Sequence, residues 1–299
     1  MTVHIPVLLQ ETINNLNVPR GGTFLDGTLG SGGHSAALAK QVSGQITIIG
    51  LDQDEEALER SRDMLFGLSD KVFLRQVNFR LLDEVLEGLG IQSVDAILLD
   101  LGLSSNQLEE SGRGFSFQKD EPLLMTMIRQ PGENDLTAEK ILNTFSEEAL
   151  ELILRGFGEE RYSKKIAREI VERREKKSFK TTSDLLEAVR AATPASYHRG
   201  KINPATRTFQ AIRIAVNEEL TALEEGLEKG FKILKPRGRF AVISFHSLED
   251  RIVKNFFRDK AQKGLGKLIT KKPIVPTEEE KQRNPRSRSA KLRVIEKIK

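Results

Sequence analysis

The sequence contains no cysteine and no tryptophan, and it has four histidines among 299 residues. The lack of cysteine excludes disulfides, thiol nucleophiles and thiolate zinc sites, and four scattered histidines provide little for a metal site, so we expect no metal. No apolar run approaches the ~18 residues of a membrane span. The first residues, MTVHIPVLLQET, lack the basic and long apolar regions of a signal peptide. We therefore expect a cytoplasmic protein without a membrane partner.

Apolar residues make up 38% of the chain and charged residues 30%, which is typical of a folded globular protein. Its length allows one large domain or two of ordinary size. The net charge of +4 hides an asymmetry, because residues 1–160 hold 12 Lys/Arg against 26 Asp/Glu, whereas residues 161–299 hold 35 against 17. The basic half favours a polyanionic partner such as nucleic acid, and a solvated charged surface is the alternative.

The first hundred residues alternate short apolar runs with amphipathic stretches, a rhythm typical of a parallel sheet covered by helices. A polar or glycine-rich turn follows each expected strand, and these strands are Thr23–Leu25, Gln45–Leu51, Val72–Gln76 and Val94–Leu99. Apolar residues at three- and four-residue spacing predict crossover helices over Ser35–Gln41, Glu55–Leu68 and Leu81–Leu89. The pattern predicts a doubly wound α/β domain.

The rhythm stops after Asp100, and residues 105–206 give helix and loop signals without a convincing strand. The expected elements there are helices around 137–155 and 162–177, a helix that begins near Thr182, and a loop at 111–122. The α/β pattern then resumes with a helix at 205–230, a turn at 235–238, a strand at 239–244, a helix at 248–258 and a strand at 292–298. We predict a discontinuous α/β domain of residues 1–104 and 207–299, interrupted by an all-helical insertion at 105–206.

A glycine-rich turn follows the first expected strand. Asp26 ends that strand, and glycines stand at 27, 30, 32 and 33. Backbone N–H groups of such a turn, and of the helix that it opens, bind anionic ligand groups. The order does not match the dinucleotide pattern, which opens immediately from the strand as G-x-G-x-x-G. It suits S-adenosylmethionine better, since Asp26 can bind the ammonium of this cofactor while N–H groups bind its carboxylate.

Two further strand ends extend this predicted cofactor site. Asp52 ends the second strand, where its carboxylate can accept hydrogen bonds from both ribose hydroxyls. Asn78 and Phe79 follow the third strand, and Phe79 is placed to pack on the adenine. The alternatives are a simple tight turn at the glycines, a helix cap at Asp52 and a core aromatic at Phe79. All three features fall at carboxyl ends of strands, where open α/β sheets bind ligands, and this favours the cofactor.

Asp100 ends the fourth strand, where a methyltransferase of this architecture meets its acceptor. The exocyclic amine of a nucleobase shares its lone pair with the ring, so groups that accept its two hydrogens favour the nucleophilic form. Asp100, a nearby backbone carbonyl and Ser104 are candidates for this role, and His246 follows another central strand. Alternatively, Asp100 binds the cofactor, Ser104 caps a helix and His246 is structural.

Several familiar motifs are missing, among them G-x-x-x-x-G-K-[ST], H-E-x-x-H and G-x-S-x-G, so ATPase, zinc protease and hydrolase functions lose their support. Basic segments are plentiful, with nine Lys/Arg against three Glu in 161–180 and eight against one in 281–299. Both segments are candidates for phosphate binding. Without tryptophan, stacking on single strands relies on residues such as Phe115, Phe117, Tyr162 or His246.

Segments spread over nearly the whole chain resemble the small-subunit ribosomal RNA cytosine-N4 methyltransferases, often called RsmH or MraW. The segments that carry the resemblance are His4–Leu9, Asp26–Ser35, Asp100–Ser105, Arg113–Phe117, Gly158–Arg161, Asn203–Gln210, Ser244–Arg251 and Asn284–Ser289. The resemblance implies a Rossmann-like domain with a helical insertion. It also implies methyl transfer from S-adenosylmethionine to N4 of a cytidine in the decoding region of 16S rRNA, with the small ribosomal subunit as partner.

Carried onto matching positions, the family's cofactor contacts are Gly32, Gly33, His34, Asp52, Phe79, Asp100 and Gln107. The resemblance thus moves Asp100 toward the cofactor. Within the matched segments the candidate RNA contacts are Arg113, Phe115, Arg207, Arg286 and Arg288.

One stretch departs from the family. Where we expect Asp and Arg in a P-L-D-M-R-M pattern, this chain has uncharged Leu124 and Thr126, which weakens the assignment of the substrate more than that of the reaction. The rival functions are methylation of amines in another nucleic acid, a ribosome-assembly role that binds the cofactor without catalysis and, more distantly, a dinucleotide-dependent oxidoreductase. The sequence leaves the oligomeric state open, a homodimer included.

Overall fold

The computed structural model describes residues 6–69, 71–200 and 203–299. These residues form two compact units. The first combines the described residues up to Gly102 with Leu220–Lys299, and the second is Leu103–Glu219. Among the described residues, none of the helices is both long and apolar enough to cross a membrane.

A sheet of seven strands forms the centre of the first unit, in the order β3-β2-β1-β4-β5-β7-β6. Neighbours from β3 to β5 pair in parallel, whereas β7 pairs antiparallel with both β5 and β6. The strands are β1 (Gly22–Asp26), β2 (Ile46–Asp52), β3 (Lys71–Gln76), β4 (Val94–Asp100), β5 (Leu234–Ser244), β6 (Gly266–Leu268) and β7 (Lys291–Lys297).

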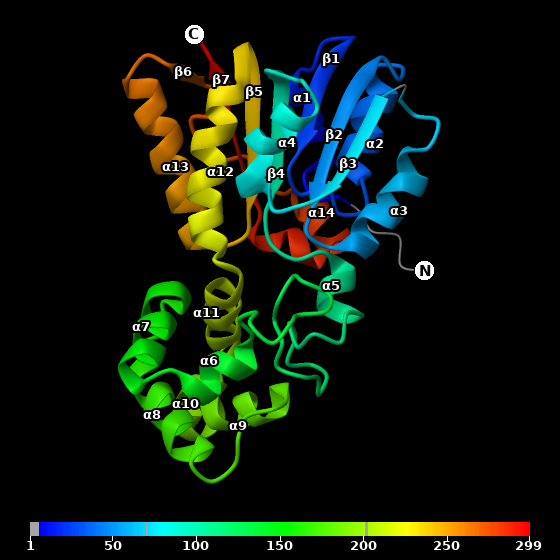
Figure 1. Cartoon of the computed structure of the whole chain (residues 1–299). Helices are drawn as coiled ribbons and strands as arrows, with labels where there is room; N and C mark the ends of the chain where they lie inside the picture. Colours follow the sequence, from blue (N-terminus) through cyan, green and yellow to red (C-terminus); the bar gives the residue numbers. More distant parts are fainter. Residues whose placement is uncertain (1–5, 70, 201–202) are drawn as a thin grey trace. The chain divides into compact units, whose positions relative to one another are not determined.

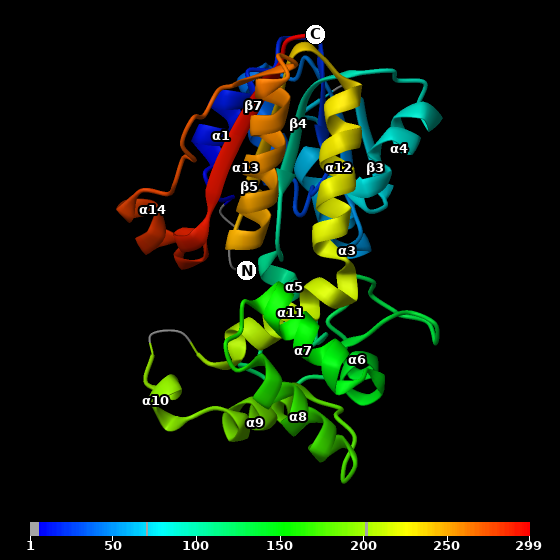
Figure 2. The same ribbon diagram turned by 90° about the vertical axis from the view of Figure 1, so that its left-hand side faces the viewer.

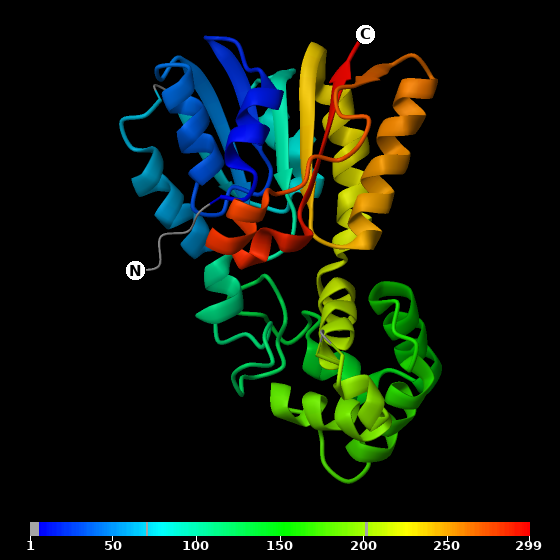
Figure 3. The ribbon, with the colours of Figure 1, turned by 180° about the vertical axis from the view of Figure 1, so that it is seen from behind.

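Helices cover both faces of this sheet. Figure 1 shows α4, α12 and α13 in front of the strands, Figure 3 shows α1 and α2 on the opposite face, and Figure 2 shows α1 and α12 on opposite sides. The helical elements of this part of the chain are α1 (Leu9–Leu16), α2 (Gly33–Gln41), α3 (Glu55–Leu65), η1 (Phe79–Leu81), α4 (Leu82–Gly88), α12 (Glu219–Ile233), α13 (Ser247–Gln262), α14 (Glu278–Arg283) and η2 (Pro285–Ser289). The predicted doubly wound α/β fold is confirmed.

The strand sequences explain the two layers. Successive side chains of a strand point to opposite faces, and in the central strands both sets are apolar. Phe24, Ile48 and Leu98 are buried with α1, α2 and α3, whereas Leu25 and Ile97 are buried with α4, α12 and α13. Burial on both faces therefore holds the central strands in place, so that their carboxyl ends lie at one edge of the sheet.

The second unit consists of helices and a long irregular segment between α5 and α6. Its helices are α5 (Ser105–Glu109), α6 (Ala138–Thr144), α7 (Glu147–Gly158), α8 (Ser163–Arg174), α9 (Thr182–Ala192), α10 (Ala195–His198) and α11 (Ala205–Asn217). An apolar core that includes Leu154, Ile166, Leu185 and Phe209 holds them together.

The C-terminal limit of this unit differs from the predicted insertion, which ended at residue 206. The compact unit extends to Glu219 because α11 packs against α6, α7 and α9. The long helical pattern predicted at 205–230 is helical in the structure, but it forms two helices, α11 and α12. Glu218 has a left-handed backbone (φ 49°), which ends α11 and separates it from α12.

The predicted turn at 235–238 lies inside a strand, since β5 runs from Leu234 to Ser244. The chain still deviates there, because Arg237 has φ 66° and the pairing with β4 shifts register between Val94 and Ala96. A Cβ on Gly238 would lie 2.8 Å from the carbonyl oxygen of Lys235, so only glycine fits this irregularity. The short strand β6 was not predicted.

Candidate cofactor and active site

Three aspartates end three neighbouring strands of the sheet. Asp26, Asp52 and Asp100 are the last residues of β1, β2 and β4, and β1 lies between the other two. The order of the strands reverses direction at β1 and β4, which is the position where open α/β sheets bind ligands. We call this edge, with the glycine turn after β1, the strand-end rim.

Asp26 is almost fully buried in the rim. Its carboxylate accepts hydrogen bonds from the Ser35 hydroxyl (2.7 Å) and the Thr28 backbone N–H (3.3 Å). Burial raises the pKa of Asp26 to about 6, and the hydrogen bonds oppose the shift. The negative charge of Asp52 contributes to the rise. Asp26 therefore favours a bound cation that can take the place of its proton.

The glycine turn leads into α2. Gly30 and Gly32 both have positive φ (54° and 79°), and a Cβ on Gly30 would meet no atom of the described residues within 4 Å. Gly33 has no room for a side chain, because a Cβ there would lie 2.4 Å from Cγ of Pro6. Among the described residues, no side chain caps the N-terminus of α2. Its first N–H groups are available to an anionic group, and the predicted contact with a carboxylate stays a prediction.

Asp52 connects the turn to the second strand. One carboxylate oxygen accepts the N–H of Gly30 (2.8 Å) and the other accepts that of Asp54 (2.9 Å). Burial raises the pKa of Asp52, and these two hydrogen bonds oppose the rise. Each carboxylate oxygen has a second lone pair for a further donor, such as a ribose hydroxyl.

Asp100 has an unsatisfied oxygen. Its backbone N–H donates to the Thr28 hydroxyl (2.5 Å), and its Oδ2 lies 3.7 Å from Nδ1 of His34. Its Oδ1 is buried and has no hydrogen-bond partner among the described residues. Burial raises the pKa of Asp100 well above its usual range, and the charges of Asp26 and Glu249 add to the rise. A buried acceptor of this kind calls for a ligand with N–H groups and positive charge.

Phe79 lies at the start of η1, directly after β3, and is partly buried. A Cβ on Gly226 of α12 would lie 2.6 Å from Cδ2 of Phe79, so the ring packs closely on this glycine. The alternative of a core aromatic thus receives partial support. Contact with an adenine stays a prediction.

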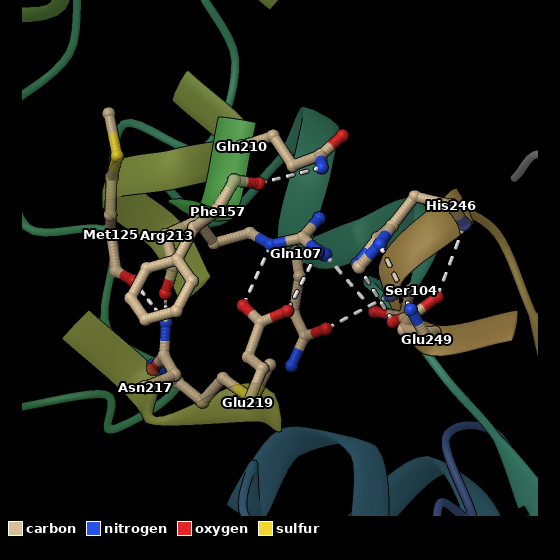
Figure 4. Close-up of polar contacts among 11 residues, drawn as sticks. Ser104, Gln107, Met125, Phe157, Gln210, Arg213, Asn217, Glu219, His246 and Glu249 are labelled. Carbon is tan, nitrogen blue, oxygen red and sulfur yellow. Dashed lines mark hydrogen bonds and ion pairs between the residues drawn. The ribbon is translucent and has the colours of Figure 1, made fainter. Parts of the chain in front are cut away.

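His246 caps a helix. Its Nδ1 accepts the N–H of Glu249 (3.4 Å), and a carboxylate oxygen of Glu249 accepts the N–H groups of Phe245 (2.8 Å) and His246 (3.3 Å). Figure 4 shows the contacts between His246 and Glu249 at the start of α13. The Nε2 atom of His246 lies 3.2 Å from the second oxygen of Glu249. This arrangement gives His246 a structural role, and its part in catalysis stays a prediction.

Ser104 and Gln107 belong to the second unit and pair with each other. The Ser104 hydroxyl accepts the Gln107 N–H (3.2 Å) and the Gln107 side chain accepts the Ser104 N–H (2.9 Å), which forms a capping box for α5 (Figure 4). Figure 4 also shows the ion pair between Arg213 and Glu219 (2.8 Å) in the same unit. The proposed roles of Ser104 in catalysis and of Gln107 in cofactor binding stay predictions.

The candidate RNA contacts divide into two groups. Arg113 is 5% exposed, and its Nη1 donates to the carbonyls of Thr126 (3.3 Å) and Met127 (2.8 Å). Phe115 is 6% exposed, with the Arg113 guanidinium over its ring. Both side chains hold the irregular segment together, and this burial does not favour contact with RNA, which stays a prediction.

The other three RNA candidates remain accessible. Arg207 and Arg288 are exposed, and Arg286 is half-buried. Their contact with RNA is not established by this geometry and stays a prediction.

Sequence reasoning missed three residues that shape the rim. Ser35 and Thr28 hold Asp26 and Asp100 through their hydroxyls, and Glu249 anchors the start of α13. Ser35 and Thr28 stand within or beside the glycine turn, where a hydroxyl near a strand-end acid is a usable signal. Glu249 follows His246 by three residues, the spacing of a capping box.

The topology of the sheet and the acidic strand-end rim define a Rossmann-like protein of the methyltransferase class. A sequence model of the MraW methylase family matches residues 1–298. The chain belongs to this family, as the resemblance predicted.

Curated relatives agree with the family match. The chain is 48% identical over 312 residues to "Ribosomal RNA small subunit methyltransferase H" of Acetivibrio thermocellus and 49% identical over 311 residues to the protein of that name in Heliobacterium mobile, with 99% of each chain covered in both cases. Among solved structures, it is similar to an S-adenosylmethionine-dependent O-methyltransferase of Thermotoga maritima, with 12% identity and a TM-score of 0.43 over 100% of this chain and 68% of the other.

The protein is a methyltransferase, and its cofactor is S-adenosylmethionine. The rim fits this molecule at two independent points. The unpartnered Oδ1 of Asp100 matches its ammonium, and the uncapped N-terminus of α2 matches its carboxylate. When bound, the cofactor supplies a methyl group activated by a positive sulfonium.

Proposed function

We propose that the protein methylates N4 of a cytidine in the decoding region of 16S rRNA within the small ribosomal subunit. The observation that carries the proposal is the buried, unpartnered Oδ1 of Asp100 at the end of β4, in a rim whose acids favour a cationic cofactor. The relatives named ribosomal RNA small subunit methyltransferase H support the substrate class. Such a substrate places the reaction in the cytoplasm.

The roles of the cofactor contacts follow from their chemistry. Asp52 accepts the ribose hydroxyls, while the N–H groups around Gly32, Gly33 and His34 bind the carboxylate. Asp26 and Asp100 balance the positive charges of the ligand. Phe79 borders the adenine, and Gln107 contributes from α5.

Ser104 and His246 are proposed to orient the target amine, and Asp100 is the alternative acceptor if it does not bind the cofactor. Acceptors for its two hydrogens hold the nitrogen in the tetrahedral, nucleophilic form. The amine becomes acidic once methylated, so no strong base is needed, and His246 or Asp100 passes the proton to water. Positioning therefore supplies most of the catalysis.

The test is methyl transfer from labelled S-adenosylmethionine to small subunits from cells that lack this enzyme, with naked rRNA and DNA in parallel. Nucleosides from each digested product are identified by mass spectrometry. We expect N4-methylcytidine from the subunits. Methylated DNA alone would instead indicate another nucleic acid substrate, and cofactor binding without transfer to any acceptor would indicate a non-catalytic assembly protein.

A further inference from the structure

The only two tyrosines of the chain meet on the second unit, next to an arginine. The rings of Tyr162 and Tyr197 lie 4.9 Å apart between centroids, at 61° to each other. The guanidinium of Arg161 lies 4.7 Å from the centroid of each ring. Arg161 is exposed and both tyrosines are partly exposed, so this group, which we call the tyrosine–arginine cluster, is accessible to a ligand.

A buried acid holds the cluster in place. Glu160 is 2% exposed, and it accepts the Tyr197 hydroxyl (2.8 Å) with one oxygen and the Tyr162 N–H (2.8 Å) with the other. The two tyrosines come from different elements, since Tyr162 precedes α8 and Tyr197 lies in α10. This anchoring fixes the rings before any ligand arrives, which reduces the entropy lost on binding.

Two of the sequence segments shared with the family build this part of the unit. The Arg207 guanidinium donates to the carbonyl of Glu159 (3.1 Å), and a Cβ on Gly158 would lie 2.7 Å from the Arg207 carbonyl. The segments Gly158–Arg161 and Asn203–Gln210 are therefore packed against each other. The strand-end rim accounts for neither segment.

Exposed cations flank the cluster, while Glu160 within it is a buried acid and Glu159 beside it is an exposed one. The first turn of α8 carries Lys164 and Lys165, both exposed, and contains no acid. Cations at a helix N-terminus oppose the helix dipole, so this placement lowers the stability of α8. The helices α3 and α7, by contrast, begin with two glutamates each. A destabilising set of charges beside partly exposed aromatic rings indicates an anionic ligand with flat groups.

We propose that the tyrosine–arginine cluster is a binding site for single-stranded RNA. An unpaired base stacks on Arg161 and the tyrosine rings, as aromatic and guanidinium planes bind bases in single strands. The flanking phosphates contact Lys164, Lys165 and Arg207. The inference rests on the proposed rRNA substrate and assigns part of its recognition to the second unit.

The chain offers a direct signal for this site. With no tryptophan and both tyrosines in the cluster, all tyrosine fluorescence of the protein comes from these two rings. A short oligouridylate, an RNA duplex of equal length and heparin are titrated into the full-length protein. We expect the oligouridylate to quench tyrosine emission, whereas heparin binds without quenching because it has no bases.

Three variants separate stacking from charge. We expect Arg161→Ala to weaken oligouridylate binding by about tenfold or more, from the usual effect of losing one stacking partner. Arg161→Lys keeps the charge but loses the planar group, so it also weakens binding. Lys176→Ala removes an exposed charge beyond the other end of α8 and should change affinity less than about twofold, as expected of a peripheral charge. Thermal melting of each variant establishes that it is folded.

Oligouridylate binding without quenching would overturn the inference, as would equal losses in Arg161→Ala and Lys176→Ala. A melting temperature lowered by Arg161→Ala with unchanged affinity would show that the cluster only joins α8 to α10. Methylation of small subunits is measured in parallel. If Arg161→Ala methylates small subunits with an unchanged KM, the RNA-binding site is overturned and the proposed function stands. If the wild-type protein shows quenching by oligouridylate but transfers no methyl group, the RNA-binding site is supported and the proposed substrate and reaction are overturned.

Discussion

Among the side chains of the strand-end rim, Asp52 has the role that is easiest to isolate. Its carboxylate ties the turn at Gly30 to the segment at Asp54, and each oxygen keeps a lone pair for a ribose hydroxyl. Asp52→Ala should weaken S-adenosylmethionine binding by about 100-fold, since two hydrogen bonds to a charged group contribute about 3 kcal/mol. Calorimetry measures the affinity and thermal melting the fold. An unchanged Kd in a folded variant would contradict the ribose contact.

The acids of the rim also predict how cofactor binding depends on pH. The pKa of Asp26 is about 6 when folded and near 3.8 otherwise, so this group alone stabilises the fold at low pH and loses that contribution as pH rises through 6. The affinity for the cofactor depends on pH in the opposite direction, because a cationic ligand binds better when the Asp26 carboxylate is charged. We expect affinity to fall by up to about tenfold per pH unit below 6 and to level off above it.

This pH dependence has a matched variant. Asp26→Asn should flatten the profile, although Asp100, whose pKa is also raised, leaves a residual slope. Calorimetry between pH 5 and 7.5 in buffers of different ionisation enthalpy measures the proton release directly. A flat profile for the wild-type protein would mean that these carboxyls do not face the cationic groups of the cofactor.

The helix α12 shows how an element outside the rim shapes it. Gly226→Ala places a methyl group 2.6 Å from the ring of Phe79, which must then move. We expect the cofactor affinity to fall several-fold, and the gain of about 1 kcal/mol in helix propensity to be offset by an overpacking cost of roughly 1–3 kcal/mol. Calorimetry and chemical denaturation measure the two effects.

Gly156→Ala in α7 is the matched control for this change. A Cβ at this position would meet no atom within 4 Å, so the substitution should slightly stabilise the protein and leave cofactor affinity unchanged. If Gly226→Ala binds the cofactor as tightly as Gly156→Ala does, Phe79 is a core aromatic and not an adenine contact.

The sequence predicts the elements that carry the rim better than the remaining ones. The strands that end in Asp52 and Asp100 are mostly apolar on both faces and stop at an acid. This one pattern predicts both that the strand is buried in a parallel sheet and where it ends. The strand β6 has only three residues, too few for a pattern. The break at Glu218 lacks a glycine or proline, and its left-handed backbone depends on tertiary packing.

Individual site residues were harder to predict than elements. The sequence around Arg113 suggests an exposed charge, but the guanidinium is buried. It donates hydrogen bonds to the carbonyls of Thr126 and Met127, which lie 13 and 14 residues further along the chain. The same segment holds the uncharged Leu124 and Thr126 where the family pattern suggests Asp and Arg. Thr126 is 3% exposed, so at this position the departure affects packing of the segment and not an accessible surface.

The charge of the whole chain predicts how RNA binding responds to salt. Residues 161–299 have an excess of Lys/Arg, whereas the strand-end rim is acidic. RNA and the cofactor therefore bind to parts of the protein with opposite charge. RNA affinity should fall at least about tenfold between 0.1 and 0.3 M salt, because bound counterions are released, whereas cofactor affinity should change little. Filter binding and calorimetry over this range measure both. A salt-independent RNA affinity would rule out phosphate contacts by the basic segments.

The central claim is that the strand-end rim of β1, β2 and β4 binds the methyl donor. A crystal structure with S-adenosylhomocysteine tests it most directly, since this product keeps the ammonium, carboxylate and ribose of the donor. We predict the ammonium at Oδ1 of Asp100, the ribose hydroxyls at Asp52 and the carboxylate at the start of α2. A ligand bound elsewhere, with Oδ1 of Asp100 still unpartnered, would contradict the account.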